Sequence, residues 1–173
     1  MPKIIENVRE QLLDEAKRQI TEYGYAKATI RSVSKACGLG TGTVYNYFPS
    51  KDMLIASVMA EDWKICLRQM EDRASDEAEP IIRGIYEGLS GFIQKYHTLF
   101  CDSDAVKIYA TMFSERHQQL RKQLAVFVQP ICDRTSVENK NFLAEWIAES
   151  LLTWTVAGKG IDEQYEIIKQ LIK

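Results

Sequence analysis

The chain has 173 residues, of which 46% are apolar and 27% are charged, and its net charge at pH 7 is -2. These values are typical of a folded protein and exclude a chain that is disordered throughout. No apolar run approaches the ~20 residues that a membrane-spanning helix needs, and the first residues lack the apolar core of a signal peptide. We therefore expect a cytoplasmic protein. Its four cysteines lie far apart without a Cys-x-x-Cys pair, which favours free thiols over a disulfide framework or a zinc site.

The charge is unevenly distributed along the chain. Residues 1–55 hold eight Lys or Arg against six Asp or Glu, whereas the remainder holds 14 basic and 18 acidic residues. No acidic residue occurs between Tyr23 and Lys51. An acid-free window in an acidic chain indicates a place where an anion can approach. Chance can also produce such a window, so charge alone does not establish a nucleic-acid interface.

Helical periodicity dominates the first 70 residues. The first predicted helix ends at Gly24, a residue suited to a left-handed stop. Thr29 is a good N-cap for a second helix, Thr41 can cap a short third one, and Ser50 can cap a long fourth one. The apolar stripe of the first helix comprises Ile5, Val8, Leu12, Leu13, Ala16 and Ile20.

Residues 29–48 therefore form a short helix, a tight glycine turn and a second short helix, preceded by a helix on which they can pack. This is the order of a helix-turn-helix, whose second helix enters the major groove of DNA. The outward side chains of that helix carry hydroxyls, an amide and aromatic rings, and none is charged. They are Thr41, Thr43, Asn46 and Tyr47, with Tyr45 at the margin, where core packing beside Val44 and Phe48 is the alternative.

Four short motifs follow one another in this region with a specific spacing. They are Gly24-Tyr25, Thr29-Ile30-Arg31, Ala36-Cys37-Gly38-Leu39, and the run from Gly42 to Lys51 (GTVYNYFPSK). Over about residues 8–60 these motifs resemble the DNA-binding domain of TetR-family transcriptional regulators. Gly40, Thr41 and Tyr47 depart from the residues that are common in the family, which bears on the operator and on some phosphate contacts.

The resemblance implies DNA contacts at nine positions. Phosphate contacts are expected from Thr29 and Lys51, the latter in the first turn of a helix, where an ammonium and the helix dipole both favour an anion. The long side chain of Arg31 is expected to contact a base from the second helix. Gly42 has no side chain, so the backbone is expected to approach a base edge there. The expected DNA-binding residues are Thr29, Arg31, Thr41, Gly42, Thr43, Tyr45, Asn46, Tyr47 and Lys51.

The C-terminal two thirds of the chain are also predicted to be helical. After a polar linker ending near Pro80, a fifth helix carries Gly84, Gly88 and Gly91 on one face, which indicates either close helix packing or room for a ligand. Apolar and aromatic side chains in this part suggest a site for an apolar or planar effector, although core packing explains the same residues. The candidate ligand-binding residues are Trp63, Met70, Phe92, Tyr96, Tyr109, Phe113, His117 and Trp146.

The last two predicted helices, within residues 141–173, are apolar over more than one face. A monomer would expose a large apolar patch here, and such a patch usually marks an interface. We therefore expect a homodimer held by a four-helix bundle, which is also typical of the TetR family. The candidate interface residues are Leu143, Ile147, Leu151, Trp154, Tyr165, Ile168 and Ile172.

Together these features predict an all-α protein of about nine helices. Residues 1–50 are expected to form a three-helix DNA-binding domain, and residues 51–173 a helical effector-binding and dimerisation domain. The resemblance implies a repressor that binds a palindromic operator as a homodimer and is released by a small molecule. No set of converging acids, histidines or nucleophiles predicts an enzyme, so no catalytic residue, cofactor or metal is expected. A helix-turn-helix that docks a protein partner is the remaining alternative.

Overall fold

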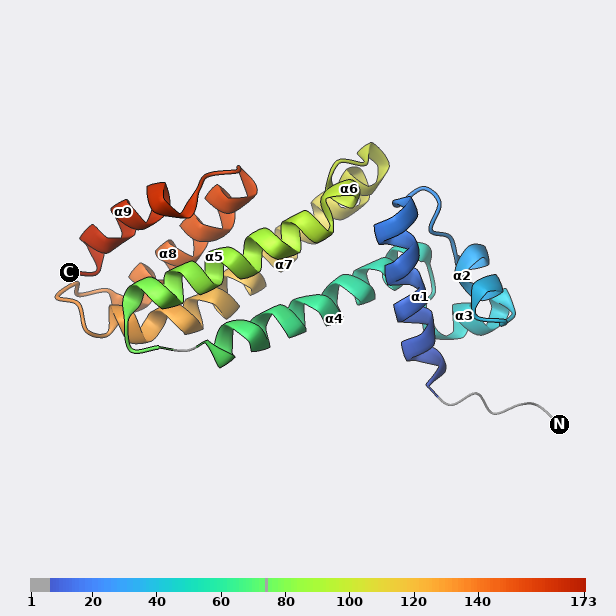
Figure 1. Cartoon of the computed structure of the whole chain (residues 1–173), viewed down its shortest axis with the longest axis horizontal. Helices are drawn as coiled ribbons and strands as arrows, with labels where there is room; N and C mark the ends of the chain where they lie inside the picture. The colour runs from blue at the N-terminus through green and yellow to red at the C-terminus, as the bar shows by residue number, and fades with distance from the viewer. Residues whose placement is uncertain (1–6, 74) are drawn as a thin grey trace. The chain divides into compact units, whose positions relative to one another are not determined.

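The computed structural model describes residues 7–73 and 75–173, without the side chains of Phe100 and of residues 104–115. All regular structure in the described part is helical, which confirms the predicted all-α fold (Figure 1). The nine helices there are α1 (Val8–Tyr23), α2 (Ile30–Ala36), α3 (Thr41–Tyr47), α4 (Lys51–Asp72), α5 (Ala78–Lys95), α6 (His97–Phe100), α7 (Ser103–Cys132), α8 (Lys140–Val156) and α9 (Ile161–Leu171).

The chain divides into two compact units. One comprises Met1–Trp63 and Lys95–Ile108, and the other comprises Lys64–Gln94 and Tyr109–Lys173. Helices α4 and α7 begin in the first unit and end in the second. The functional division expected at residue 50 stays a prediction.

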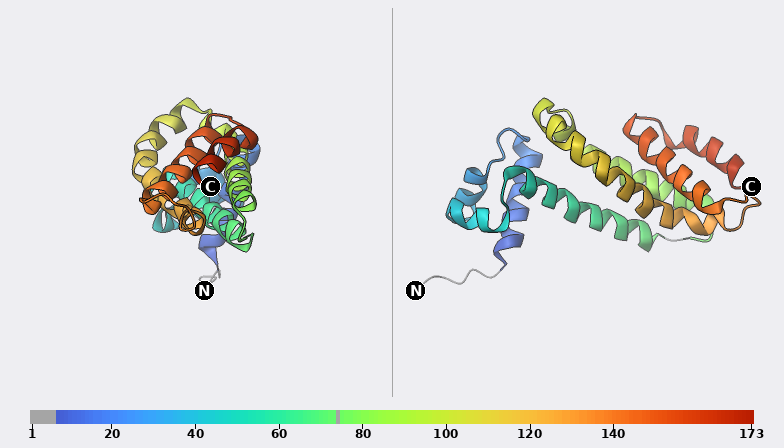
Figure 2. Two further views of the ribbon diagram at one scale, coloured as in Figure 1. Left: turned by 90° about the vertical axis from the view of Figure 1, so that its left-hand side faces the viewer. Right: turned by 180° about the vertical axis from the view of Figure 1, so that it is seen from behind.

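In the first unit, α2 and α3 lie side by side next to α1 (Figures 1 and 2). The predicted stripe of α1 is buried from Val8 to Ile20, because residues three and four apart share one face of a helix, while Ile5 lies outside the described residues. Gly24 has the positive φ angle, 79°, that was predicted for the residue ending α1, and Gly38, in the predicted glycine turn after α2, has a φ of 67°. The buried apolar side chains around this stripe are Ile30, Val33, Val44, Phe48, Leu54, Ile55 and Val58.

Two details of the predicted helix ends differ from the structure. Thr41 is the first residue of α3 and not its cap, because Gly40 takes the cap position and offers no side-chain hydrogen bond. Helix α5 begins at Ala78, which places Pro80 inside its first turn, where a missing N–H costs nothing. The predicted cap of α4 is confirmed, since Oγ of Ser50 accepts a 3.1 Å hydrogen bond from the N–H of Met53.

In the second unit, α8 and α9 are neighbours joined by a turn at Gly158, whose φ is 80° (Figure 2). Helix α8 buries apolar side chains along most of its length, as its composition predicts. Asn139 caps it by accepting a 3.1 Å hydrogen bond from the N–H of Phe142. The largest fully buried aliphatic side chains of this unit are Ile82, Ile85, Leu124, Ile147, Leu151 and Ile168.

The three glycines of α5 serve different purposes. A methyl group at Gly88 would overlap Cε of Met70 and lie 3.0 Å from Sγ of Cys66, so α4 and α5 pack closely at this point. A methyl group at Gly84 or Gly91 would meet nothing within 4 Å. Of the two alternatives left open by the sequence, close packing therefore holds at Gly88.

We expect Gly88→Ala to be less stable than Gly91→Ala by about 1–2 kcal/mol in free energy of unfolding, because Met70 must leave its position. Both substitutions remove a helical glycine, so their difference isolates the steric contact. Urea denaturation of the two variants measures this difference. Equal stabilities would show that Met70 moves without cost.

Candidate nucleic-acid interface

Helix α3 is anchored by two buried side chains and otherwise faces outward. Val44 is fully buried and Phe48, directly after the helix, is 3% exposed. Thr43 is half-buried, and the other outward residues are exposed, including Tyr45, which excludes the core-packing alternative for that tyrosine. The exposed residues of α3 are Thr41, Gly42, Tyr45, Asn46 and Tyr47. All of them are uncharged, so the solvent-exposed face of α3 carries no charged side chain.

A capping box fixes the start of α2. The Oγ1 of Thr29 accepts a hydrogen bond from the N–H of Ser32 (3.0 Å), and the Oγ of Ser32 accepts one from the N–H of Thr29 (2.9 Å). The Ser32 hydroxyl then donates to Oε1 of Gln19 (2.5 Å), a buried residue of α1, whose amide donates to Glu15 (2.7 Å). Ser32 and Gln19 were not predicted, because serine is a weak third residue of a capping box and nothing in the sequence pairs it with Gln19.

Three cationic side chains near α2 remain available for an anion. Arg31 and Lys35 are exposed on α2 and Lys27 precedes it. None of the three has an ion pair or hydrogen bond from its charged group within the described residues. The other two arginines of residues 7–63 are engaged elsewhere: Arg9 lies 3.5 Å from a carboxylate oxygen of Glu61, and Arg18 pairs with Glu15 and Glu22.

Lys51 is half-buried beside Tyr25. Its Nζ donates to the carbonyl oxygen of Tyr25 (2.5 Å) and lies 3.6 Å from the centre of the Tyr25 ring, while the Tyr25 hydroxyl donates to Asp52 (2.7 Å). Burial lowers the pKa of Lys51, an effect that the nearby Asp52 carboxylate partly offsets. In this arrangement Lys51 joins the start of α4 to the segment after α1. Its expected phosphate contact stays a prediction.

Gly42 has no conformational or steric role inside the chain. Its φ is not in the left-handed region, and a methyl group in its place would meet nothing within 4 Å. A glycine inside a helix costs about 0.5–1 kcal/mol relative to alanine. Gly42 therefore lowers the stability of the helix, and no other part of the described chain fills the space beside it.

A buried carboxylate joins three segments of the same unit. Asp62 of α4 has a side chain that is 6% exposed, and it accepts hydrogen bonds from Lys17 of α1 (2.6 Å), from the Tyr96 hydroxyl (2.6 Å) and from Lys95. Burial by itself raises the pKa of Asp62, but the bonds from Lys17, Lys95 and Tyr96 outweigh it and hold that pKa below its ordinary value. Burial, with Asp62 next to it, raises the pKa of Tyr96.

The predicted ligand-binding residues are in different environments. Trp63, Met70 and Tyr96 are buried, Phe92 is half-buried, and Trp146 is 42% exposed. The side chains of Tyr109 and Phe113 lie outside those that the structure describes. The ligand role of all these residues stays a prediction.

His117, the remaining ligand candidate, contacts a carboxylate of the neighbouring helix. Its Nε2 lies 2.8 Å from Oε1 of Glu149 on α8. Burial raises the pKa of Glu149, but the bonds with His117 and Thr153 and the charge of Arg121 lower it below its ordinary value. His117 therefore has a hydrogen-bond partner inside the protein.

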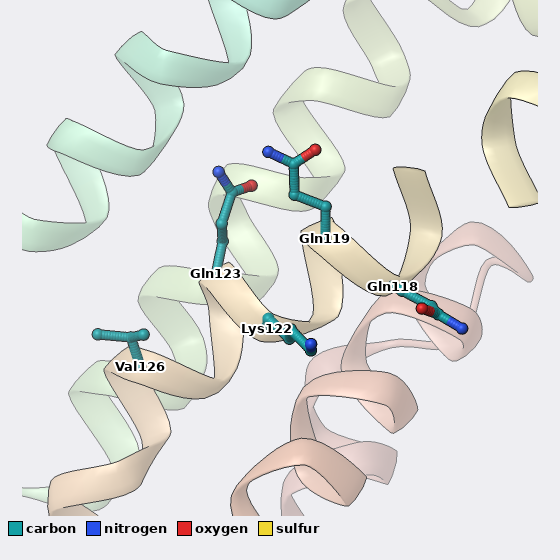
Figure 3. A pocket seen from close by; sticks show the side chains of 5 residues that line it. All are labelled: Gln118, Gln119, Lys122, Gln123 and Val126. Atoms are coloured by element: carbon teal, nitrogen blue, oxygen red, sulfur yellow. The ribbon is translucent and has the colours of Figure 1, made fainter. Parts of the chain in front are cut away.

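Described residues of the second unit line a small cavity and a hollow. One, of about 110 Å³, lies between α4 and α5, and Met70 is the only ligand candidate in its lining. The other is a hollow on α7, and Figure 3 shows that all its lining side chains project from that single helix. They are Gln118, Gln119, Lys122, Gln123 and Val126. Neither lining is the apolar, aromatic one expected for the effector.

The candidate interface residues fall into two groups. Leu143, Ile147, Leu151 and Ile168 are buried within the chain, whereas Trp154 is 50% exposed and Tyr165 and Ile172 are half-buried. The exposed large apolar side chains of α8 and α9 are Phe142, Trp146, Trp154, Val156 and Ile167. Of these, Phe142, Val156 and Ile167 were not among the candidate residues.

The helical architecture and the uncharged surface of α3 define an all-α protein of the helix-turn-helix class. Residues 12–58 match the family described as "Bacterial regulatory proteins, tetR family". The HTH-type transcriptional repressor Rv1474c of Mycobacterium tuberculosis is 41% identical over 66 residues, which cover 36% of this chain and 35% of that protein. Over residues 12–58 the chain is therefore similar to the TetR family. The match spans about a third of the length of that relative.

Solved structures share the fold over nearly the whole chain. A transcriptional regulator from Cytophaga hutchinsonii superposes with a TM-score of 0.65 at 19% identity, covering 94% of this chain and 91% of that one. The multidrug binding protein EbrR, complexed with imidazole, superposes with a TM-score of 0.60 at 16% identity, covering 95% and 94%. At such identities the likeness shows the fold alone.

No described helix is both long and apolar enough to cross a membrane. Within the same residues, no three or more His, Cys, Asp or Glu side chains gather in a way that could hold a metal ion.

Proposed function

We propose that this chain is a transcriptional repressor that binds a palindromic DNA operator as a homodimer and is released by a small molecule. The observation that carries the proposal is the exposed, uncharged face of α3, held on buried Val44 inside an acid-free window. A duplex repels carboxylates and accepts hydroxyl, amide and aromatic groups along its grooves. The capping box at Thr29 and the free cations of α2 support phosphate contacts beside this face.

The proposal assigns DNA binding to residues 1–50 and effector binding and dimerisation to residues 51–173. Rv1474c is named a repressor, which supports the direction of regulation. EbrR is named a multidrug binding protein and was solved with imidazole, which supports a small-molecule effector of apolar or aromatic character. Such an effector acts by binding the DNA-bound and released conformations unequally.

The test is selection of bound sequences from random duplex DNA by the full chain, followed by affinity measurements at two salt concentrations, because phosphate contacts make affinity salt-dependent. We expect a palindrome whose half-sites lie about one helical turn (~34 Å) apart. Adding a panel of apolar and aromatic compounds should then release the operator for at least one compound. Enrichment of no palindrome over bulk DNA would overturn the proposal.

The dimer is proposed to form through the exposed apolar side chains of α8 and α9. Replacing both Phe142 and Val156 by glutamate should convert the dimer to a monomer in analytical ultracentrifugation at micromolar concentration, because buried unpaired carboxylates are costly in an interface. Both side chains are 63% exposed in the chain, so the helical circular dichroism should stay unchanged. Arg68→Glu, at an exposed position of α4, is the control for added negative charge. A wild-type protein that is already monomeric would contradict this assignment.

A further inference from the structure

The side chains of α3 differ in kind from those that ordinarily recognise G·C base pairs. Guanine is read mainly by Arg or Lys at O6 and N7, and cytosine by Asp or Glu at N4. Helix α3 contains none of these four residue types. Its exposed groups are instead those that suit A·T pairs: an amide for adenine N6 and N7, and threonine methyls and aromatic edges for the thymine methyl.

These groups are not engaged within the protein. The Asn46 amide, the hydroxyls of Thr41 and Thr43 and the hydroxyls of Tyr45 and Tyr47 have no hydrogen-bond partner in the part of the chain that the structure describes. Asn46 therefore keeps both its N–H donors and its carbonyl acceptor for a bidentate contact. Tyr45 and Tyr47 are 53% and 46% exposed, so their ring edges are accessible as well.

The cations of residues 7–63 whose charged groups have no partner among the described residues belong to α2 or to the segment before it, whereas Lys51 donates to the Tyr25 carbonyl oxygen. Lys27, Arg31 and Lys35 lie there without a carboxylate partner among the described residues, whereas Arg9 and Arg18 are held by carboxylates of α1 and α4. A lysine acts on DNA mainly as a point charge for phosphates, while the planar guanidinium of arginine can bind guanine in a bidentate manner. Arg31 is consequently the one arginine of residues 7–63 whose guanidinium is not held by a carboxylate among the described residues, which makes it the candidate for a bidentate guanine contact.

We infer that α3 reads A·T base pairs and that specific recognition of guanine in each half-site is confined to the base pair that Arg31 reaches. The inference rests on the proposed DNA-binding function and adds the class of sequence that the interface accepts. Thymine methyls and adenine edges carry the contacts of α3, and the cations of α2 carry the phosphate contacts and the single guanine.

The experiment repeats the selection from random duplex DNA with the full wild-type chain and with Asn46→Ala, Thr43→Ala and Arg31→Ala. Arg68→Ala, which removes an exposed arginine of the second unit, is the matched control and should return the wild-type sequence. Asn46→Ala should lose roughly tenfold or more of its preference for adenine at one base pair per half-site, and Arg31→Ala should lose a preference of similar size for guanine at another. Asn46→Arg should change the base selected at the first of these positions from adenine to guanine.

The outcomes separate this inference from the function on which it rests. A·T pairs at the positions that respond to Asn46 and Thr43, with guanine only where Arg31 acts, support the inference. The inference would be overturned if the positions that respond to the α3 variants were G·C pairs. It would also be overturned by a selected guanine that Arg31→Ala does not affect. Neither result would contradict the proposed DNA-binding function. No enriched palindrome at all would overturn the proposed function itself.

Discussion

Asp62→Ala is expected to lower the free energy of unfolding by about 3 kcal/mol, because it leaves the fully buried Tyr96 hydroxyl without its acceptor and removes the partner of two lysines. Lys17 and Lys95 are about a third exposed, so they can turn toward water and limit the loss. Tyr96→Phe removes one of the three bonds and should cost about 1 kcal/mol. Chemical denaturation at pH 7 measures both values. Equal losses for the two variants would show that the lysines contribute nothing.

The contribution of Asp62 should also depend on pH. The folded-state pKa of Asp62 lies below its ordinary value, so its charged form stabilises the fold above the unfolded pKa of about 3.9. This stabilisation is lost as the pH falls through the folded-state pKa, where the carboxyl becomes protonated in both states. The difference in stability between wild type and Asp62→Asn should therefore shrink between pH 5 and the lowest pH at which the fold persists. A difference that stays constant over this range would contradict the ion pairs described at Asp62.

Gly42→Ala is expected to raise stability by about 0.5–1 kcal/mol and at the same time to weaken operator binding about tenfold, because a methyl group fits the free protein but meets the duplex. Gly42→Leu should weaken binding further, to about a hundredfold or more, since the larger side chain holds α3 away from the base edges. Denaturation and equilibrium DNA binding on the same preparations measure the two effects.

Gly91→Ala is the matched control for this pair of effects. Gly91 is also an exposed helical glycine with nothing within 4 Å of an added methyl group, but it lies in α5 of the second unit. It should show the gain in stability and no change in DNA affinity. If Gly42→Leu binds the operator as tightly as wild type does, the start of α3 does not face the duplex.

The elements that could be predicted from the sequence are those set by local rules. The stripe of α1, the glycine stops at Gly24 and Gly38, and the cap at Thr29 each depend on residues a few positions apart, and all three are present in the structure. The exposed face of α3 could also be predicted from the sequence. The helix is so short that the one apolar residue Val44 identifies which side is buried. Thr41 was wrong as a cap because a residue with a good capping side chain can equally occupy the first helical position.

Contacts between distant residues could not be predicted. Asp62 meets Lys17, Lys95 and Tyr96 across separations of 33 to 45 residues, and periodicity within one helix carries no information about such partners. The same limit applies to α8, whose apolar residues cover more than one face. Which face fills the core depends on the helices packed against it, so Leu143, Ile147 and Leu151 lie inside while Phe142 and Val156 lie outside.

The hydrogen-bond chain from Thr29 through Ser32 and Gln19 to Glu15 has a consequence for the thermodynamics of association. Every member of that chain is already fixed in the free protein, at distances of 2.5 to 3.0 Å. The N-terminal end of α2 therefore needs no further ordering when a DNA duplex binds. Preorganisation of this kind reduces the conformational entropy lost on binding, which favours the proposed association with DNA although α3 carries no charge.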